Sequence, residues 1–134
     1  LDRWILSELN SLVISVTEAL ERFTPDDAAH QSEQFIEYLS NWYVRRSRRR
    51  FWKSDVDEDK QAAYATLYEC LVTLTRLIAP IIPFVSETMF LNLSRPSGEG
   101  RESVHLESYP VTDEAVIDRR LSQAVRLAMG EENE

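Results

Sequence analysis

Cysteine and glycine are scarce in this sequence of 134 residues, which holds one cysteine and three glycines. The single Cys70 cannot form an internal disulfide and cannot by itself supply a structural zinc site, so we expect a reducing compartment. All three glycines lie beyond residue 97. The preceding part of the chain therefore cannot form a glycine-rich phosphate-binding loop, because the backbone of such a loop adopts conformations that other residues resist.

Long apolar runs are also absent. No stretch approaches the ~20 apolar residues of a membrane-spanning helix, and the N-terminus does not have the layout of a signal peptide. We therefore expect a cytoplasmic protein that has no contact with a membrane. The sequence does not begin with Met, which leads us to expect a piece of a larger protein. With 43% hydrophobic residues it can bury one core, as a single domain of residues 1–134.

Apolar residues recur at intervals of three and four in the first part of the chain. This pattern predicts an amphipathic helix from Asp2, as its N-cap, to Arg22. A second helix is predicted to begin after Thr24, because Thr is a favourable N-cap and Pro25 fits the first helical position. Two acids follow at the positive end of the helix dipole. We expect this second helix to continue without interruption to Trp52.

The remaining sequence predicts three more helices. A third helix runs from residues 57–59 to Pro80, with an apolar face that begins at Tyr64, and Pro83 opens a short fourth helix. We further predict a loop over residues 94–102, an extended segment over residues 103–106, and a fifth helix from residue 112 or 113 to Gly130, followed by an acidic tail. Short connections between long helices make neighbours antiparallel, so the sequence predicts an all-α, up-and-down bundle of about five helices.

The predicted second helix has a strongly basic C-terminal end. Six of the fifteen basic residues of the chain lie between residues 45 and 53, where no acid interrupts them. They are Arg45, Arg46, Arg48, Arg49, Arg50 and Lys53. The net charge of −8 therefore conceals an acidic body with one cationic end. The expected core-facing stripe of this helix, Ala28, Ser32, Phe35, Leu39 and Trp42, continues as Arg46, Arg49 and Lys53.

These cations must contact water, acids or phosphate, because an isolated charge in an apolar interior costs many kcal/mol. Arginine suits phosphate, since its planar guanidinium group forms paired hydrogen bonds. Aromatic residues on both sides of the cluster could stack on unpaired bases while the arginines follow a nucleic-acid backbone. We expect Trp42 and Tyr43 to lie in the core, whereas core and surface positions both remain open for Phe51 and Trp52.

Two other interpretations of the basic cluster remain open. Cations at the C-terminus of a helix are favoured by its dipole, although this effect covers only the last turn. Four acids in the following connection could also neutralise the cluster across the hairpin. They are Asp55, Asp57, Glu58 and Asp59. The run from Arg45 to Arg50 also has the composition of a nuclear-localisation signal, a pattern of low specificity.

Other candidate sites are weaker. His30 and His105 have no second ligand at metal-binding spacing, so we expect both to be structural and predict no metal site. Cys70 is expected to be a core thiol. Glu18 and Glu21 form a pair of acids on one helix, but exposed carboxylates on an amphipathic helix are ordinary. We therefore predict no catalytic residue in this chain.

One segment is far more specific than its charge. Residues 40–52, with the sequence SNWYVRRSRRRFW, resemble a segment of isoleucyl-tRNA synthetases, in the helical anticodon-binding domain that follows the catalytic domain. Stretches that agree with this family in order and spacing are residues 1–7, 63–68, 77–84 and 103–110. The resemblance covers roughly residues 1–120, with Tyr109 where the family usually has Trp. Valine-specific relatives share the opening helix but have fewer arginines in the second.

The resemblance implies a class Ia synthetase fold and a parent enzyme that joins isoleucine to its tRNA with ATP and magnesium. The catalytic signatures HIGH and KMSKS are absent from this sequence. We therefore expect that this chain alone is inactive and holds no cofactor. In the family a further helix precedes the residues that match Leu1 to Trp4. We expect a truncated domain that lacks both this helix and the catalytic domain.

The sequence therefore predicts a module that binds the anticodon stem-loop of isoleucine tRNA. The expected tRNA-binding residues are Arg45, Arg46, Arg48, Arg49, Arg50, Trp52 and Lys53. The alternative is a helical module whose basic end docks on the catalytic domain of its parent chain and supports that domain with little RNA contact. In both cases we expect a monomer, with tRNA and the catalytic domain as its partners.

Overall fold

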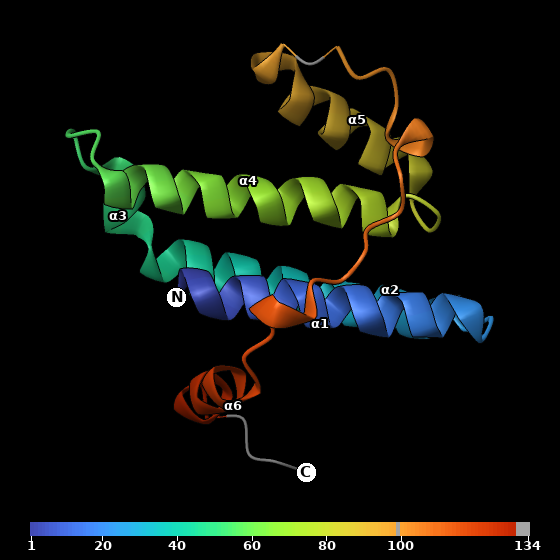
Figure 1. Cartoon of the computed structure of the whole chain (residues 1–134), viewed down its shortest axis with the longest axis horizontal. Coiled ribbons are helices and arrows are strands. Elements are labelled where there is room, and N and C mark those ends of the chain that lie inside the picture. Colours follow the sequence, from blue (N-terminus) through green and yellow to red (C-terminus); the bar gives the residue numbers. More distant parts are fainter. Residues whose placement is uncertain (99, 131–134) are drawn as a thin grey trace.

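The described residues form an all-α bundle (Figure 1). The structure is a computed structural model that describes residues 1–98 and 100–130. Its α-helices are α1 (Asp2–Glu21), α2 (Pro25–Glu37), α3 (Arg48–Trp52), α4 (Glu58–Ile78), α5 (Pro83–Ser94) and α6 (Arg119–Ala128). The π-helix η1 (Tyr38–Val44) follows α2, and the 3-10 helices are η2 (Arg95–Ser97), η3 (Val104–Leu106) and η4 (Glu114–Val116). These two ranges contain no strand, so the predicted fold class is confirmed.

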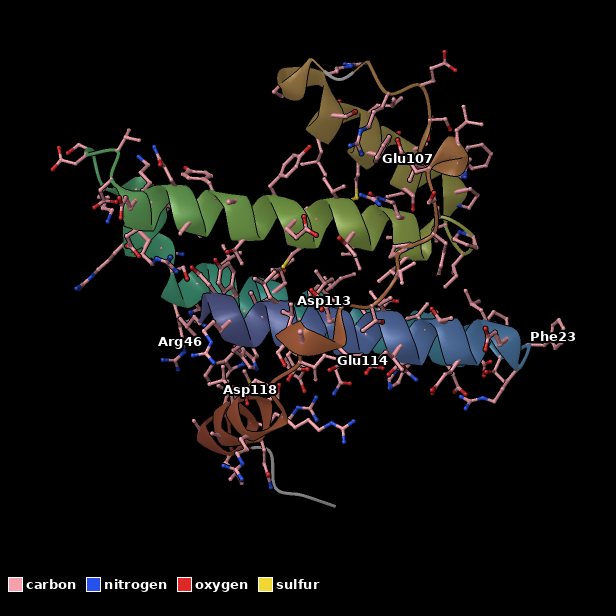
Figure 2. The ribbon with its side chains drawn as sticks, viewed as in Figure 1. Phe23, Arg46, Glu107, Asp113, Glu114 and Asp118 are labelled. Carbon is pink, nitrogen blue, oxygen red and sulfur yellow. The ribbon has the colours of Figure 1, made fainter. Side chains whose placement is uncertain are left out.

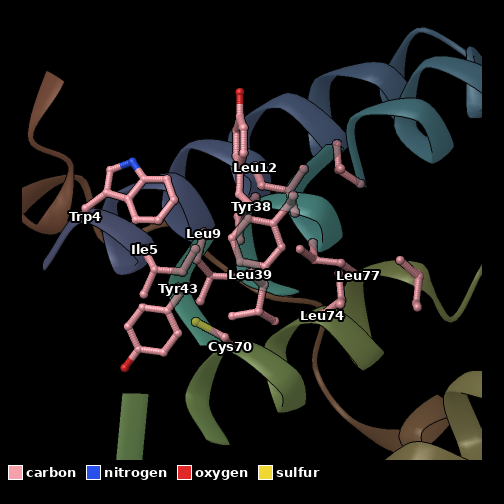
Figure 3. Close-up of a cluster of buried hydrophobic side chains, with 14 of the residues drawn as sticks. Trp4, Ile5, Leu9, Leu12, Tyr38, Leu39, Tyr43, Cys70, Leu74 and Leu77 are labelled. Carbon is pink, nitrogen blue, oxygen red and sulfur yellow. The ribbon is translucent and has the colours of Figure 1, made fainter. Parts of the chain in front are cut away.

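The main core lies between α1, α4 and the continuous stretch of α2 and η1 (Figure 3). Side chains that meet there include Trp4, Ile5 and Leu9 from α1, Tyr43 from η1, and Cys70 and Leu77 from α4. Burial raises the pKa of the Cys70 thiol to about 12, so the thiol remains protonated at neutral pH. The prediction that Cys70 is a core residue is confirmed.

α1 begins and ends close to the predicted residues and α2 begins where predicted, but the predicted N-cap of α1 is wrong. Leu1 is the N-cap of α1, and Asp2 is the first helical residue, where its carboxylate can reach other elements. Thr24 is the N-cap of α2, as predicted, yet its hydroxyl donates to the carbonyl oxygen of Ala19 at 2.9 Å. The Thr24 side chain therefore secures the turn between the helices instead of capping an α2 amide.

The prediction of one continuous helix over residues 25–52 is wrong. The α-helix changes into the π-helix η1, and a turn at Ser47 interrupts the helix before α3. In a π-helix each N–H binds the carbonyl group five residues back, so each turn takes up more residues than an α-helical turn. The buried positions accordingly advance by four residues at a time, through Leu39, Tyr43, Ser47 and Phe51.

This change of phase also corrects the predicted core stripe. Tyr43 is fully buried, as predicted, but Trp42 is only half-buried. Arg46 and Arg49, which were expected to continue the stripe, are exposed. The apolar stripe therefore does not become basic. It continues inside the fold to Phe51, and arginines occupy the outward positions beside it.

The predicted bounds of α4 and α5 are confirmed. Asp57 caps α4 by accepting the N–H of Lys60 at 2.8 Å. The helix ends before Pro80, and Pro83 begins α5. α5 packs on α4 on the side away from α1 (Figure 1). The second, smaller core between these elements contains Val72, Ala79, Phe90 and Val104.

Two predictions for the C-terminal part are wrong. Residues 103–106, expected to be extended, include η3, and the last helix begins at Arg119 instead of residue 112 or 113. Local capping explains the later start. Asp113 accepts the N–H two residues ahead at 3.1 Å and begins η4, and Asp118 accepts the N–H three residues ahead at 3.0 Å and begins α6.

α6 lies on the other side of the bundle from α5 and packs against α1 (Figure 1). The hydroxyl of Ser7 accepts the N–H of Asp118 at 2.8 Å, and Arg126 forms an ion pair with the buried Glu8 at 3.0 Å. The predicted acidic tail, residues 131–134, and residue 99 of the predicted loop lie outside the described residues.

Candidate nucleic-acid interface

The predicted tRNA-binding residues lie together at one end of the bundle, where α1 begins and α3 connects to α4 (Figure 1). We call residues 45–53 the basic end. Figure 2 shows Arg46 at this end and Phe23 at the opposite end of α1. A turn at Ser47 separates the first two arginines from α3, which carries the others.

Four of the six cations face solvent without an acidic partner. Arg45, Arg46, Arg48 and Arg49 are exposed, and none of them forms an ion pair with an acid in residues 1–98 or 100–130. We call them the unpaired arginines. Their mutual repulsion is not neutralised within the fold, so a polyanion that contacts this surface relieves it.

Two of the unpaired arginines stack on tryptophan rings of the same segment. The guanidinium carbon of Arg46 lies 4.4 Å from the ring centroid of Trp42, and that of Arg48 lies 5.1 Å from the ring centroid of Trp52. Such cation–π contacts contribute roughly 0.5–1 kcal/mol at exposed sites. They hold the two guanidinium planes in defined orientations, which reduces the side-chain entropy that a ligand must remove.

The structure settles the two positions that the sequence left open. Phe51 is 7% exposed and packs edge-on against Tyr43 and Tyr64, with ring centroids at 6.4 and 5.1 Å. Trp52 is 74% exposed. A large aromatic ring with this exposure has no stabilising role in the core, so it is available to stack on a ligand.

A groove of about 460 Å³ lies between the basic end and α4. Its lining includes Arg45 and Arg48 as cations, Trp52 and Tyr64 as aromatic rings, and Asn41 as an amide. Cations suit phosphate, and exposed rings suit the face of an unpaired base. The groove therefore places on one surface both cations, which suit phosphate, and exposed rings, which suit the bases of single-stranded nucleic acid.

Among the groove residues that were not predicted as part of the site are one aromatic ring and one amide. Tyr64 was expected on the core face of its helix, but it is 49% exposed and donates its hydroxyl to the carbonyl oxygen of Phe51 at 3.3 Å. Asn41 lies four residues before Arg45 and so shares a helical face with it. That spacing was available in the sequence, whereas the exposure of Tyr64 depends on how α3 folds against α4.

Arg50 and Lys53 differ from the other four cations because acids hold them. Arg50 donates to both carboxylate oxygens of Asp2, at 2.6 and 2.7 Å, and to Asp59 at 3.0 Å. Lys53 Nζ lies 2.7 Å from Asp57 and 3.1 Å from Asp59. Neutralisation across the hairpin, which the sequence left open for the whole cluster, thus occurs for these two cations.

The hydrogen bonds around Asp2 shift the pKa values of the groups that form them. The hydrogen bond from Arg50 holds the pKa of Asp2 below its ordinary value, and the pairing raises the pKa of Arg50. Burial raises the pKa of the Tyr43 hydroxyl, and its hydrogen bond to Asp2 adds to this effect. Asp2 is therefore ionised and Tyr43 protonated at neutral pH. In these states the Tyr43 hydroxyl can donate its hydrogen bond to the Asp2 carboxylate.

The two histidines were expected to be structural. His30 and His105 are both exposed. Within the described ranges, no group of three or more His, Cys, Asp or Glu residues is placed to hold a metal ion. None of the helices described here combines the length and the apolar character that a membrane span requires.

Comparisons with known proteins agree with this geometry. The sequence model of the anticodon-binding domain of tRNA ligases matches residues 2–132. An isoleucine–tRNA ligase of Dehalococcoides mccartyi is 55% identical over 130 residues, which are 96% of this chain and 13% of that relative. The corresponding ligase of Thermobifida fusca is 54% identical over 127 residues, 95% of this chain and 12% of the relative.

The isoleucine–tRNA ligase of Thermus thermophilus is 46% identical over 131 residues, 96% of this chain and 13% of the relative. The chain thus spans only about an eighth of the length of these relatives. The resemblance to isoleucyl-tRNA synthetases is confirmed. The helical fold, the cationic end and the match over residues 2–132 together show that this chain belongs to the family of anticodon-binding domains of tRNA ligases.

Proposed function

We propose that this chain binds the anticodon stem-loop of isoleucine tRNA as one domain, residues 1–134, of a longer isoleucine–tRNA ligase. The observation that carries the proposal is the set of unpaired arginines beside the exposed Trp52, at one end of an otherwise acidic chain. The names of the relatives support isoleucine as the amino acid of the parent enzyme.

In the proposed complex the unpaired arginines contact backbone phosphates of the tRNA, and Trp52 contacts a base or sugar of the loop. Neutralising four phosphates releases counterions, so the logarithm of affinity should fall with the logarithm of salt at a slope of about −3 to −4. Arg50 and Lys53 belong to the same basic end, but their ion pairs with acids of this chain leave them less available for phosphate.

The chemistry of the parent ligase, the joining of isoleucine to tRNA with ATP and magnesium, is proposed to occur in a separate catalytic domain. This chain has neither the HIGH nor the KMSKS signature, so its contribution is to hold the tRNA in position. The catalytic domain is then the second proposed partner, within a monomeric enzyme of the cytoplasm.

A pair of double variants tests the proposal. We expect Arg46→Glu with Arg49→Glu to weaken binding of isoleucine tRNA at least about tenfold at moderate salt, because two phosphate contacts become repulsions. The matched control is Arg22→Glu with Arg95→Glu, which reverses two exposed arginines outside the basic end. It should bind nearly as wild type does.

Equal affinity of the wild type and both double variants for this tRNA would contradict the proposal. It would favour the alternative, in which the basic end docks on an acidic surface of the catalytic domain. Equal weakening in both double variants would also contradict it, because binding would then follow net charge instead of the position of the arginines.

A further inference from the structure

Asp2, at the start of α1, binds two side chains from distant parts of the chain. Both of its carboxylate oxygens accept hydrogen bonds from Arg50 of α3, at 2.6 and 2.7 Å. One of them also accepts the hydroxyl of Tyr43, in η1, at 2.7 Å. The side chains of Arg50 and Asp2 are only 22% and 26% exposed. We call these three residues the clamp.

The clamp connects every element that meets at the basic end. Arg50 donates at 3.0 Å to the carboxylate and at 3.2 Å to the backbone carbonyl of Asp59, at the start of α4. The hydroxyl of Tyr43 also lies 3.4 Å from the carbonyl oxygen of Ala63, one turn further along α4. α3 is thereby tied to α1, η1 and α4 through one polar group.

α3 depends on such contacts for its orientation. It has five residues, too few for a helix that is stable by itself, and the turn at Ser47 separates it from the helix before it. The buried ring of Phe51 anchors one face of α3, and Arg50 anchors the neighbouring one. The remaining side chains of α3 are those proposed to contact RNA: Arg48, Arg49 and Trp52.

Arg50 itself has little capacity left for phosphate. It donates four hydrogen bonds within the chain, two to Asp2 and two to Asp59, and a guanidinium group has five N–H donors. A paired contact with a phosphate would therefore require the Asp2 or Asp59 contacts to break.

We infer that the clamp positions α3 for RNA binding, so that Arg50 acts on the RNA through Arg48 and Arg49 and is a positioning residue, not a phosphate contact. This inference rests on the proposed function. It predicts the direction in which RNA affinity changes when the Asp2 charge is removed. Loss of the Asp2 charge makes the chain less acidic, which by long-range electrostatics alone would tighten RNA binding, yet loss of the clamp must weaken it.

Asp2→Asn in the 134-residue chain tests the direction of this change in RNA affinity. Titrations with isoleucine tRNA are made at a temperature where melting curves show each variant to be folded. We expect Asp2→Asn to raise the Kd about 5- to 10-fold, since it uncouples Arg50. The matched control Asp26→Asn removes an exposed acid from the first turn of α2, where no clamp residue lies, and should leave the Kd unchanged or lower it slightly.

Two conservative variants separate positioning from direct contact. Arg50→Lys keeps the charge, but one ammonium group lacks the planar fork that binds Asp2 and Asp59 together, so positioning predicts a loss like that of Asp2→Asn. A direct charge contact with phosphate instead predicts near wild-type affinity. Tyr43→Phe removes one hydroxyl and no charge, and we expect a weakening of about twofold in the same direction.

Hydrogen exchange provides a measurement that needs no RNA. In Asp2→Asn the amides of residues 48–53 should exchange faster than in wild type, while those in the middle of α4 should not change. Unchanged exchange over residues 48–53 would overturn the clamp. Affinity equal to or tighter than wild type in Asp2→Asn would overturn its role in RNA binding. A wild-type chain that binds no RNA would instead refute the proposed function, and exchange would still decide whether the clamp holds α3.

Discussion

Within the basic end, neighbouring cations have different surroundings. Arg49 is exposed and has no acidic partner in the described chain, whereas Arg50, the next residue, is held by Asp2 and Asp59. The two side chains are identical, so the difference comes from their direction on α3. Arg50 points towards the start of α1, and Arg49 points to solvent. Charge density along the sequence therefore locates a candidate interface without identifying which cations are available to a ligand.

The adjacent aromatic residues differ in the same way. Phe51 is buried against two tyrosine rings, and Trp52 is exposed beside Arg48. The sequence pattern could not separate these two pairs of neighbours because the π-helix and the turn at Ser47 set the phase of α3. The inner residues of α3 support the fold, and the outer ones form the surface proposed to contact RNA.

The largest effect on stability is expected from the inner aromatic residue. Phe51→Ala should lower the free energy of unfolding by about 3–5 kcal/mol, because it leaves a cavity in the core. Trp52→Ala should change it little, and it should weaken tRNA binding by the loss of about 1–3 kcal/mol of stacking. Urea unfolding and tRNA titration of both variants check this contrast. Similar stabilities for the two variants would break the distinction between inner and outer residues.

The next largest effect is expected from the outer cations as a group. Replacing all four unpaired arginines by Gln should reduce tRNA affinity roughly 100-fold or more, since four charge-assisted contacts are lost. The melting temperature should change little, because the relief of repulsion among these four cations offsets the loss of the two exposed cation–π contacts. A substantial drop in melting temperature would show that the unpaired arginines are structural.

A smaller change in stability is expected from the paired cations. Arg50→Gln leaves the partly buried Asp2 without its charged partner and should cost about 1–3 kcal/mol of unfolding free energy. That corresponds to a decrease in melting temperature of about 3 °C per kcal/mol for a chain of this size. Lys53→Gln removes a more exposed pair and should lower the melting temperature less than Arg50→Gln does. The reverse order, measured by calorimetry, would contradict the clamp.

The pH dependence of the clamp is the smallest effect. Because the Arg50 hydrogen bond holds the pKa of Asp2 below its ordinary value of 3.8, the ionised carboxylate stabilises the folded state. This stabilisation is present above the ordinary pKa and is lost as the pH falls through the lowered one. The stability difference between wild type and Asp2→Asn should therefore be constant near neutral pH and shrink below about pH 4. Urea titrations at several pH values check this, and a difference that persists in acid would argue against an ionised Asp2.

Much of the fold could be predicted because strong local signals mark it. Apolar spacing and proline positions predicted the bounds of α1, α4 and α5, and α4 begins among residues 57–59, as expected. The phase change after α2 could not be predicted, since a π-helix depends on tertiary packing and not on a residue pattern. The late start of α6 could have been found, because Asp118 is a favourable N-cap directly before the helix.

For the candidate site, the sequence predicted a cationic segment but not which of its cations have acidic partners. The arginine run and the resemblance to isoleucyl-tRNA synthetases identified the basic end. The pairing of Arg50 with Asp2 joins residues 48 positions apart, and no local spacing rule predicts such a contact. The exposure of Tyr64 has the same origin, since it depends on the way that α3 folds back on α4.

The salt dependence of tRNA binding tests most directly whether the unpaired arginines contact phosphate. For wild type, a plot of log affinity against log salt should have a slope of about −3 to −4, and each Arg→Gln replacement at positions 45, 46, 48 and 49 should make it shallower by about 0.7–0.9. Arg22→Gln, at the far end of α1, should leave the slope unchanged. A slope that stays the same after all four replacements would contradict the assignment of these arginines to the RNA backbone.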